Sequence, residues 1–194
     1  MKFLSNLLCI ILFSGCVNNY NPIPKPRAYH KIHYPAKQYK SSGLDHCPFS
    51  FEIPNYSQLV QKENYFGEEA NPCWVNIEFQ DFNAKLHLSY KSIDDTTSID
   101  KILADTRELT WKHTVKAQYI DETPIHKSEN VNGVLYSVGG NAASALQFYL
   151  TDSSSHFLRA SLYFNNRPNR DSIEPVLQYL QADVMQFIHS FEWK

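Results

Sequence analysis

Ser144 is the residue best placed to act as a nucleophile. It follows a run of small residues, 139–143, and a serine hydrolase needs a hydroxyl held beside a base and an oxyanion donor. A nucleophile elbow places its serine between a strand and a helix, whereas this turn leads into a predicted strand. A tight turn packed under a helix therefore explains the small residues better. The sequence also lacks a phosphate-binding loop, a dinucleotide fingerprint and an HExxH motif, so we predict no enzyme.

Histidines offer a second kind of chemistry, metal binding. His30 and His33 lie three positions apart and His46 adjoins a cysteine, but a zinc site needs three or four convergent ligands. His87 falls on the polar face of a predicted strand, and His113 ends a predicted helix, where its charge suits the helix dipole. We interpret all of them as solvated or structural residues, and we predict no metal and no cofactor.

The first residues read as a secretory signal with a lipid-attachment site. Lys2 precedes an apolar stretch, 3–13, and the tripeptide Ser14-Gly15-Cys16 follows. A cysteine after two small residues is typical of the bacterial lipobox, in which that cysteine is acylated and becomes the first mature residue. An uncleaved anchor helix is the alternative, but the stretch is shorter than the ~20 residues that span a bilayer. We predict a signal peptide at 1–15 and membrane anchoring through lipid on Cys16.

The remaining cysteines suggest a disulfide. Cys9 lies in the predicted signal and Cys16 is predicted to be acylated, which leaves Cys47 and Cys73 as a pair in an oxidising compartment. A bridge between them stabilises the fold by about 3–4 kcal/mol in the chain-entropy model. A redox or metal pair is less consistent with the sequence because no CxxC spacing is present. Free buried thiols remain an alternative that only geometry can separate.

The composition excludes several classes of protein. The chain has 194 residues, of which 43% are hydrophobic and 20% charged, so wholesale disorder is excluded. The net charge is −2, with acidic and basic residues well mixed, and this is not the electrostatic footprint of a nucleic-acid-binding protein. No apolar run after residues 3–13 is long enough to cross a membrane.

A proline- and tyrosine-rich tether is predicted at 16–46. Five of the ten prolines precede residue 49, and the segment 21–27 is predicted to form extended polyproline II. Tyrosines and lysines follow within the tether, so it is predicted either to lie on the domain as an edge or to dock on a partner.

A single α+β domain is predicted at 47–194, an antiparallel sheet flanked by two main helices. Alternating apolar and polar residues predict strands, at 49–53, 74–79, 84–90, 115–120, 131–138, 146–150 and 158–164. Apolar residues at helical spacing predict helices at 97–113 and from 169 to about 191. Residues 57–72 are polar and are predicted to form a long loop or a short helix.

Polar residues at the predicted strand ends and turns form a candidate partner surface: Asn141, Arg159, Asn165, Asn166, Arg167 and Asn169. Loops at such ends commonly carry function. Turn formation alone accounts equally well for the asparagines, so both interpretations stay open.

An ordered series of segments resembles one known family. They are Pro26-Arg27, Cys47-Pro48-Phe49-Ser50-Phe51, Pro72-Cys73-Trp74, Leu86-His87-Leu88-Ser89-Tyr90, Lys112-His113-Thr114, Gly140-Asn141-Ala142-Ala143-Ser144, Phe148-Tyr149-Leu150-Thr151-Asp152, His156-Phe157-Leu158-Arg159, Tyr163-Phe164-Asn165, Arg167-Pro168-Asn169 and Ser190-Phe191-Glu192-Trp193-Lys194. The chain resembles the gliding motility lipoprotein GldD family over nearly all of its predicted mature length. Ala28 and His33 depart from the glycine and the acidic residue that the family pattern leads us to expect.

The resemblance implies a source in the Bacteroidota, a lipoprotein required for gliding, and no assigned reaction or cofactor. Cys16 is not followed by an acidic cluster of the kind that directs such lipoproteins to the cell surface, so a periplasm-facing domain is expected. The order of elements is also similar to the Mog1/PsbP α/β/α sandwich, a group of mostly accessory and binding proteins. We therefore expect a lipid-anchored envelope protein that contacts gliding or secretion proteins; the alternative is a periplasmic hydrolase or a carbohydrate-binding accessory lipoprotein.

Overall fold

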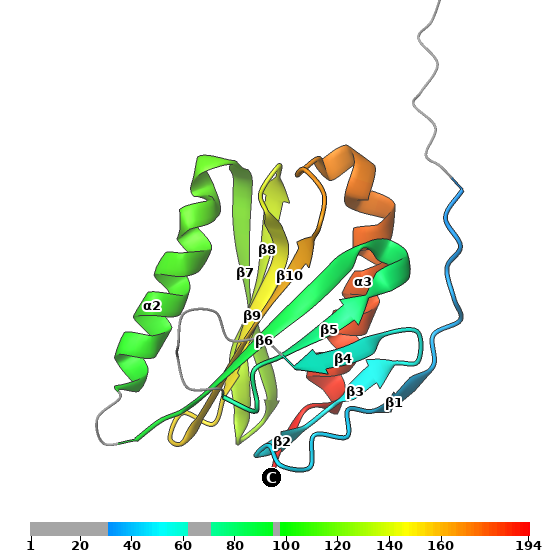
Figure 1. The fold of residues 1–194 in the computed structure, drawn as a ribbon. Helices are drawn as coiled ribbons and strands as arrows, with labels where there is room; N and C mark the ends of the chain where they lie inside the picture. Colours follow the sequence, from blue (N-terminus) through cyan, green and yellow to red (C-terminus); the bar gives the residue numbers. More distant parts are fainter. Residues whose placement is uncertain (1–30, 62–70, 95–97) are drawn as a thin grey trace, which may run out of the picture. The chain divides into compact units, whose positions relative to one another are not determined.

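Strand alternation builds the central sheet of the protein. Seven strands follow one another across it in the order β4 (Gln58–Gln61), β5 (Val75–Phe79), β6 (Ala84–Ser92), β10 (His156–Phe164), β9 (Ser144–Thr151), β8 (Val131–Gly140) and β7 (Ala117–Ser128). Every neighbouring pair is antiparallel. Successive side chains of each strand therefore point to opposite faces of the sheet. The predicted α+β class with an antiparallel sheet and two helices is confirmed (Figure 1).

The fold is described from a computed structural model. It describes residues 31–61, 71–94 and 98–194, and residues 33–194 form one compact unit. The predicted signal peptide 1–15, Cys16 and the tether up to residue 30 lie outside the described residues. No helix in the described part of the chain has the length and apolar character needed to span a membrane.

The long helix α3 (Arg170–Ser190) covers the apolar face of the sheet. Asn169 caps its first turn, because the Asn169 side chain accepts a hydrogen bond from the backbone N–H of Ser172. The ring of Phe187 lies 5.4 Å from that of Phe148 in β9. Leucines from the central strands join them in the core and are fully buried, among them Leu86, Leu88, Leu150, Leu158 and Leu162. The predicted apolar stripe of this helix thus faces the core.

The helix α2 (Ile99–Trp111) lies on the opposite side of the sheet (Figure 1). Its buried residues are Ile102, Thr106 and Thr110, and the hydroxyl of Thr110 lies 3.4 Å from Oε1 of Gln147 in β9. Gln147 precedes Phe148 in the strand, so the two helices pack against opposite faces of the same strand. The 3-10 helix η2 (Lys112–Val115) continues α2, and η1 (Gln80–Phe82) joins β5 to β6.

A disulfide lies at the end of the domain where the two-residue strands β2 (Phe49–Ser50) and β11 (Glu192–Trp193) pair. Cys47 and Cys73 are bonded to each other, with their Cα atoms 5.7 Å apart, and this is the bridge that the sequence predicted. Beside β2 and β11, the backbone N–H of Lys194 donates to the carbonyl of Pro48. The chain end is therefore fastened beside the disulfide, and the loop closure contributes about 3–4 kcal/mol.

The structure moves the predicted boundary between tether and domain. Residues 33–46 belong to the compact unit, whereas the sequence placed them in the tether. Within this segment β1 (Tyr39–Ser41) pairs with β3 (Glu52–Pro54), and Leu44 is buried. Sequence periodicity could not indicate this, because a three-residue strand carries almost no periodicity.

A buried carboxylate fastens this segment to α3. Asp183, only 3% exposed, accepts hydrogen bonds from Nζ of Lys37 at 2.7 Å and from the hydroxyls of Tyr39 and Tyr56. Lys37 Nζ also lies 3.3 Å from the ring centroid of Tyr179. Burial lowers the pKa of Lys37, while the bond to Asp183 opposes that change. We name this group the Asp183 latch.

Two strands differ from the sequence prediction. β4 lies within 57–72, which was predicted as loop or short helix, and it pairs with β5 by backbone bonds that its polar sequence does not signal. β7 extends to Ser128, well beyond the predicted end at 120. It contains Pro124, and a proline is tolerated there because β7 is an edge strand.

The Asp183 latch yields a stability prediction. We expect Asp183→Asn to lower the free energy of unfolding by about 3 kcal/mol, since the half-buried ammonium of Lys37 loses its counter-charge and one acceptor oxygen is replaced by an NH2 donor. Urea denaturation followed by circular dichroism measures this. The control is Asp105→Asn, at an exposed position of α2, which should change stability by less than about 0.5 kcal/mol. Equal stability of the two variants would contradict the role of the latch.

Candidate functional site

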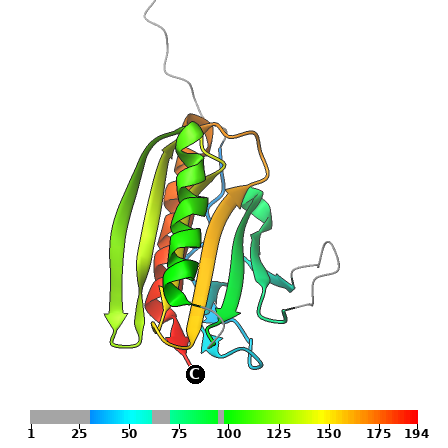
Figure 2. The same cartoon turned by 90° about the vertical axis from the view of Figure 1, so that its left-hand side faces the viewer.

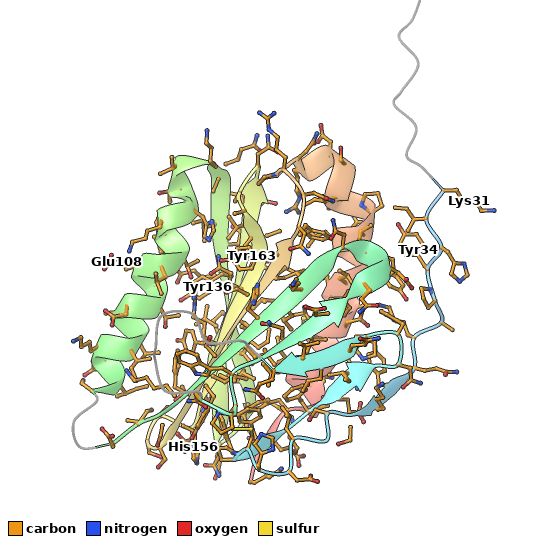
Figure 3. The ribbon with its side chains drawn as sticks, in the orientation of Figure 1. Lys31, Tyr34, Glu108, Tyr136, His156 and Tyr163 are labelled. Carbon is orange, nitrogen blue, oxygen red and sulfur yellow. A yellow bond between two sulfur atoms is a disulfide. The ribbon has the colours of Figure 1, made fainter. Side chains whose placement is uncertain are left out.

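A hollow of about 350 Å³ opens on the α2 face of the sheet. It is lined by His87, Ser89, Arg159, Ser161 and Tyr163, and we name it the Arg159 hollow. Figure 2 looks onto this face: α2 stands in front of the middle of the sheet and leaves β10, in orange, and β6, in green, uncovered beside it. Figure 3 labels Tyr163 together with Tyr136, another residue of this face.

Strand alternation places these side chains together. In β10, Leu158, Ala160 and Leu162 are fully buried on the α3 side, so the residues between them face α2. Ser161 lies opposite His87 of β6 in the register, and Arg159 lies opposite Ser89. The residues that line the hollow therefore lie on the opposite face from the buried leucines. The hollow lies where α2 does not cover this polar face.

Arg159 is held by an amide rather than by a carboxylate. Its Nη2 donates to Oε1 of Gln147 at 2.7 Å. None of the ion pairs in the described part of the chain includes Arg159. Burial lowers the pKa of Arg159, and the hydroxyls of Tyr163 and Tyr136 partly oppose this. Its Nε is buried without a hydrogen-bond partner, and a buried unpaired donor costs about 1–3 kcal/mol.

His113 lies in η2, within reach of the Arg159 charge. Burial lowers the pKa of His113, and the positive charge of Arg159 lowers it further. The sequence explained His113 by its position at the end of a helix, whereas the structure connects it electrostatically to a strand 46 positions away along the chain.

The candidate partner surface divides into separate places. Asn141, Asn166, Arg167 and Asn169 do come together, around a hollow of about 540 Å³ at the start of α3. Asn165 lies instead beside η1, where its side-chain amide donates to Oδ1 of Asn83. The predicted surface also included Arg159, which lines the hollow on the sheet face.

Local structure accounts for most of the asparagines. Asn141 Oδ1 accepts from the backbone N–H of Arg170, Asn169 caps α3, and Asn166 accepts from the Asn83 amide. These bonds hold the connection before α3 in place. Turn chemistry is therefore the better of the two interpretations for these residues.

Ser144 is not arranged as a nucleophile. It is fully buried, and its hydroxyl lies 2.9 Å from the carbonyl of Leu162 and 3.2 Å from that of Leu146. A hydroxyl that donates to backbone carbonyls in the interior has no base to activate it and no path to a substrate.

One group of metal-ligand types gathers in the described part of the chain. The ligand atoms of His46, Cys47 and Cys73 lie within 4.8 Å of one another, but the disulfide occupies both sulfur atoms. A ring N–H of His46 donates to the carbonyl of Pro72. His30 lies outside the described residues, so the interpretation of His30 and His33 as a solvated pair stays a prediction.

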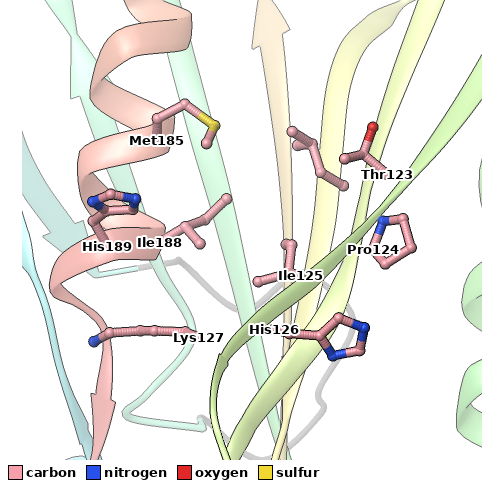
Figure 4. A pocket seen from close by; sticks show the side chains of 9 residues that line it. Thr123, Pro124, Ile125, His126, Lys127, Met185, Ile188 and His189 are labelled. Atoms are coloured by element: carbon pink, nitrogen blue, oxygen red, sulfur yellow. The ribbon is translucent and has the colours of Figure 1, made fainter.

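A second feature, which the sequence did not reveal, is an apolar groove of about 430 Å³ between α3 and β7 (Figure 4). Ile125 and Lys127 extend from β7 toward α3, and Met185, Ile188 and His189 of α3 lie across from them. Leu135 forms part of its floor. We name it the α3–β7 groove. Alternation in the segment 123–127 was the available signal, but the strand was predicted to end before it.

One comparison with known proteins agrees with the family resemblance seen in the sequence. A family model described as "Gliding motility lipoprotein GldD" matches residues 19–193. A search of curated proteins found no match. The chain is also similar to the solution structure of cyanobacterial PsbP (CyanoP) from Synechocystis sp. PCC 6803, with 13% identity and a TM-score of 0.43, over 88% of this chain and 100% of that chain.

The effect of the Arg159 charge on His113 yields a titration prediction. We expect Arg159→Gln to raise the pKa of His113, because a neighbouring positive charge no longer opposes protonation. The value should stay below the ordinary ~6.5, since burial is the larger cause of the lowering. NMR titration of the His113 ring proton measures this. Arg107→Gln removes an exposed arginine and should leave the pKa unchanged; an unchanged pKa in Arg159→Gln would contradict the coupling.

Proposed function

Because the chain belongs to the gliding motility lipoprotein GldD family, we propose that it is a lipid-anchored envelope protein of the gliding machinery that acts by binding another protein rather than by catalysis. The observation that carries the binding role is the α3–β7 groove, which combines an apolar floor with an exposed rim. Binding surfaces of proteins typically have this arrangement, an apolar centre surrounded by polar groups.

The groove suits an apolar segment of a partner. Leu135 and Ile188 are buried in its floor, while Met185 is 40% exposed at its wall. Methionine adapts its shape to a bound surface and is frequent at sites that bind proteins. Exposure of such a side chain to water has no benefit for the isolated fold, since its burial is favourable.

The rim favours an acidic flank on that segment. His126, Lys127 and His189 line the groove and no Asp or Glu does. The ammonium of Lys127 donates to the backbone carbonyl of Phe191, which follows α3, so a carbonyl rather than a carboxylate accepts it. Charge complementarity therefore points to a partner segment with apolar residues next to acidic ones.

The lipid anchor determines where the domain acts. We propose that Cys16 carries the lipid and that the domain faces the periplasm, where it contacts proteins of the gliding machinery or of its secretion system. The family match supports lipoprotein character, and the disulfide supports an oxidising compartment.

The groove is tested by Met185→Glu. A carboxylate at the apolar wall should abolish partner binding, because it must be desolvated on association and repels an acidic flank. The measurement is mild crosslinking of intact envelopes, purification of the protein and identification of co-purifying gliding and secretion components. We expect such a component with the wild type and a loss of at least about tenfold with Met185→Glu.

The matched control is Leu109→Glu. Leu109 is 43% exposed and belongs to α2, on the other side of the sheet, so the change is of the same kind but away from the groove. It should retain the component. The proposal is overturned if Met185→Glu retains it too, or if the wild type yields no gliding or secretion component.

Anchoring is tested by Cys16→Ser. Without the thiol no acyl chain can be attached, so the precursor should stay unprocessed and gliding should be lost. Fractionation of cells, mass spectrometry of the N-terminus and colony spreading measure this. Cys9→Ser, a change inside the predicted signal, should be processed normally. Mature, membrane-bound and motile Cys16→Ser protein would show that the lipid is attached elsewhere.

A further inference from the structure

The Arg159 hollow has an excess of hydrogen-bond donors. Three buried polar atoms of this part of the sheet have no hydrogen-bond partner: Nε of Arg159, Nε2 of Gln147 and Oγ of Ser161. Among the described residues only one other buried side-chain atom shares this condition, Nε1 of Trp193. Native proteins satisfy nearly all buried polar atoms, so three unsatisfied ones in one place call for a physical explanation.

The three atoms are neighbours in the sheet. Ser161 lies opposite Gln147 in the register of β10 and β9, and Gln147 holds Nη2 of Arg159 through its carbonyl oxygen. The same oxygen lies 3.4 Å from the hydroxyl of Thr110. Gln147 is therefore fixed by α2 and by Arg159 together, which leaves its amide N–H groups as donors.

The charge of the hollow is also one-sided. Arg159 is a permanent cation, and the lining residues include no carboxylate. Glu78 of the neighbouring strand β5 pairs with Lys85, and Asn76, which is hydrogen-bonded to His87, carries no charge. A half-buried guanidinium with a free Nε lacks the partner that such groups ordinarily have.

We propose that the Arg159 hollow binds a small ligand that carries an oxyanion, a carboxylate or a phosphate. The anion accepts hydrogen bonds from Nε and Nη2 of Arg159 and from the hydroxyl of Ser161, in the forked geometry that arginine offers to such groups. Gln147 is a positioning residue that orients the guanidinium. The rings of Tyr163 and His87, with centroids 5.4 Å apart and nearly edge to face, form a wall for the remainder of the ligand.

The size of the hollow agrees with a small molecule. Its volume of about 350 Å³ lies at the lower end of the range for ligand pockets. The hollow lies on the opposite face of the sheet from the α3–β7 groove, so this inference is independent of the proposed protein partner.

The test uses the purified lipoprotein and two simple anions as probes. Sodium acetate and inorganic phosphate are titrated separately at constant ionic strength, with chloride as the balancing salt, while NMR follows the Nε–Hε group of Arg159 and the side-chain amide of Gln147. We expect a saturable shift of both signals with at least one probe. Saturation by acetate assigns a carboxylate ligand, and saturation by phosphate assigns a phosphate.

Variants separate a specific site from general ion effects. Arg159→Gln should weaken binding by about tenfold or more, because a charge-assisted bond is lost. Ser161→Ala, which changes no charge and little volume, should weaken it several-fold and guards against misfolding of the first variant. Arg107→Gln, an exposed arginine of α2, should bind like the wild type. The inference is overturned if neither anion gives a saturable shift, or if Arg159→Gln and Ser161→Ala both bind as the wild type does.

Discussion

The two-residue repeat of the central strands is the constraint on which the rest of the structure depends. In β6, β9 and β10 the leucines share one face, and that face must be covered if it is to leave water. α3 supplies the cover with its own apolar stripe. The same repeat presents polar residues on the other face, which α2 covers only in part.

The two faces of the sheet differ in how completely their side chains find partners within the protein. On the α3 side, aromatic rings pack closely, as those of Phe51 and Phe187 do with centroids 4.2 Å apart. On the α2 side, Arg159 and Ser161 keep donors without partners in the protein. Unsatisfied groups of this kind lower stability and are retained where a ligand or partner satisfies them.

One charged residue, Asp183, interrupts the apolar stripe of α3 and connects the helix to the segment 33–46. Asp183 lies among buried residues of the helix, where Lys37 supplies its counter-charge and the hydroxyls of Tyr39 and Tyr56 donate hydrogen bonds to it. The desolvation cost of a buried carboxylate can exceed the attraction to its partners, and here those partners join the segment that contains Lys37 and Tyr39 to α3. Residues 33–46 thus become part of the domain rather than a spacer.

The sequence by itself determined the local patterns, namely the alternation of β6 and β10 and the stripe of α3 with Asn169 at its start, and it made Cys47 and Cys73 the candidate pair for a bridge. These follow from residue types a few positions apart, or from counting cysteines. Tertiary structure alone decided that Ser161 lies between His87 and Gln147, that Lys37 reaches Asp183, and that β7 and α3 frame a groove. Each of these contacts joins segments far apart in the chain, and no local period encodes which strands become neighbours.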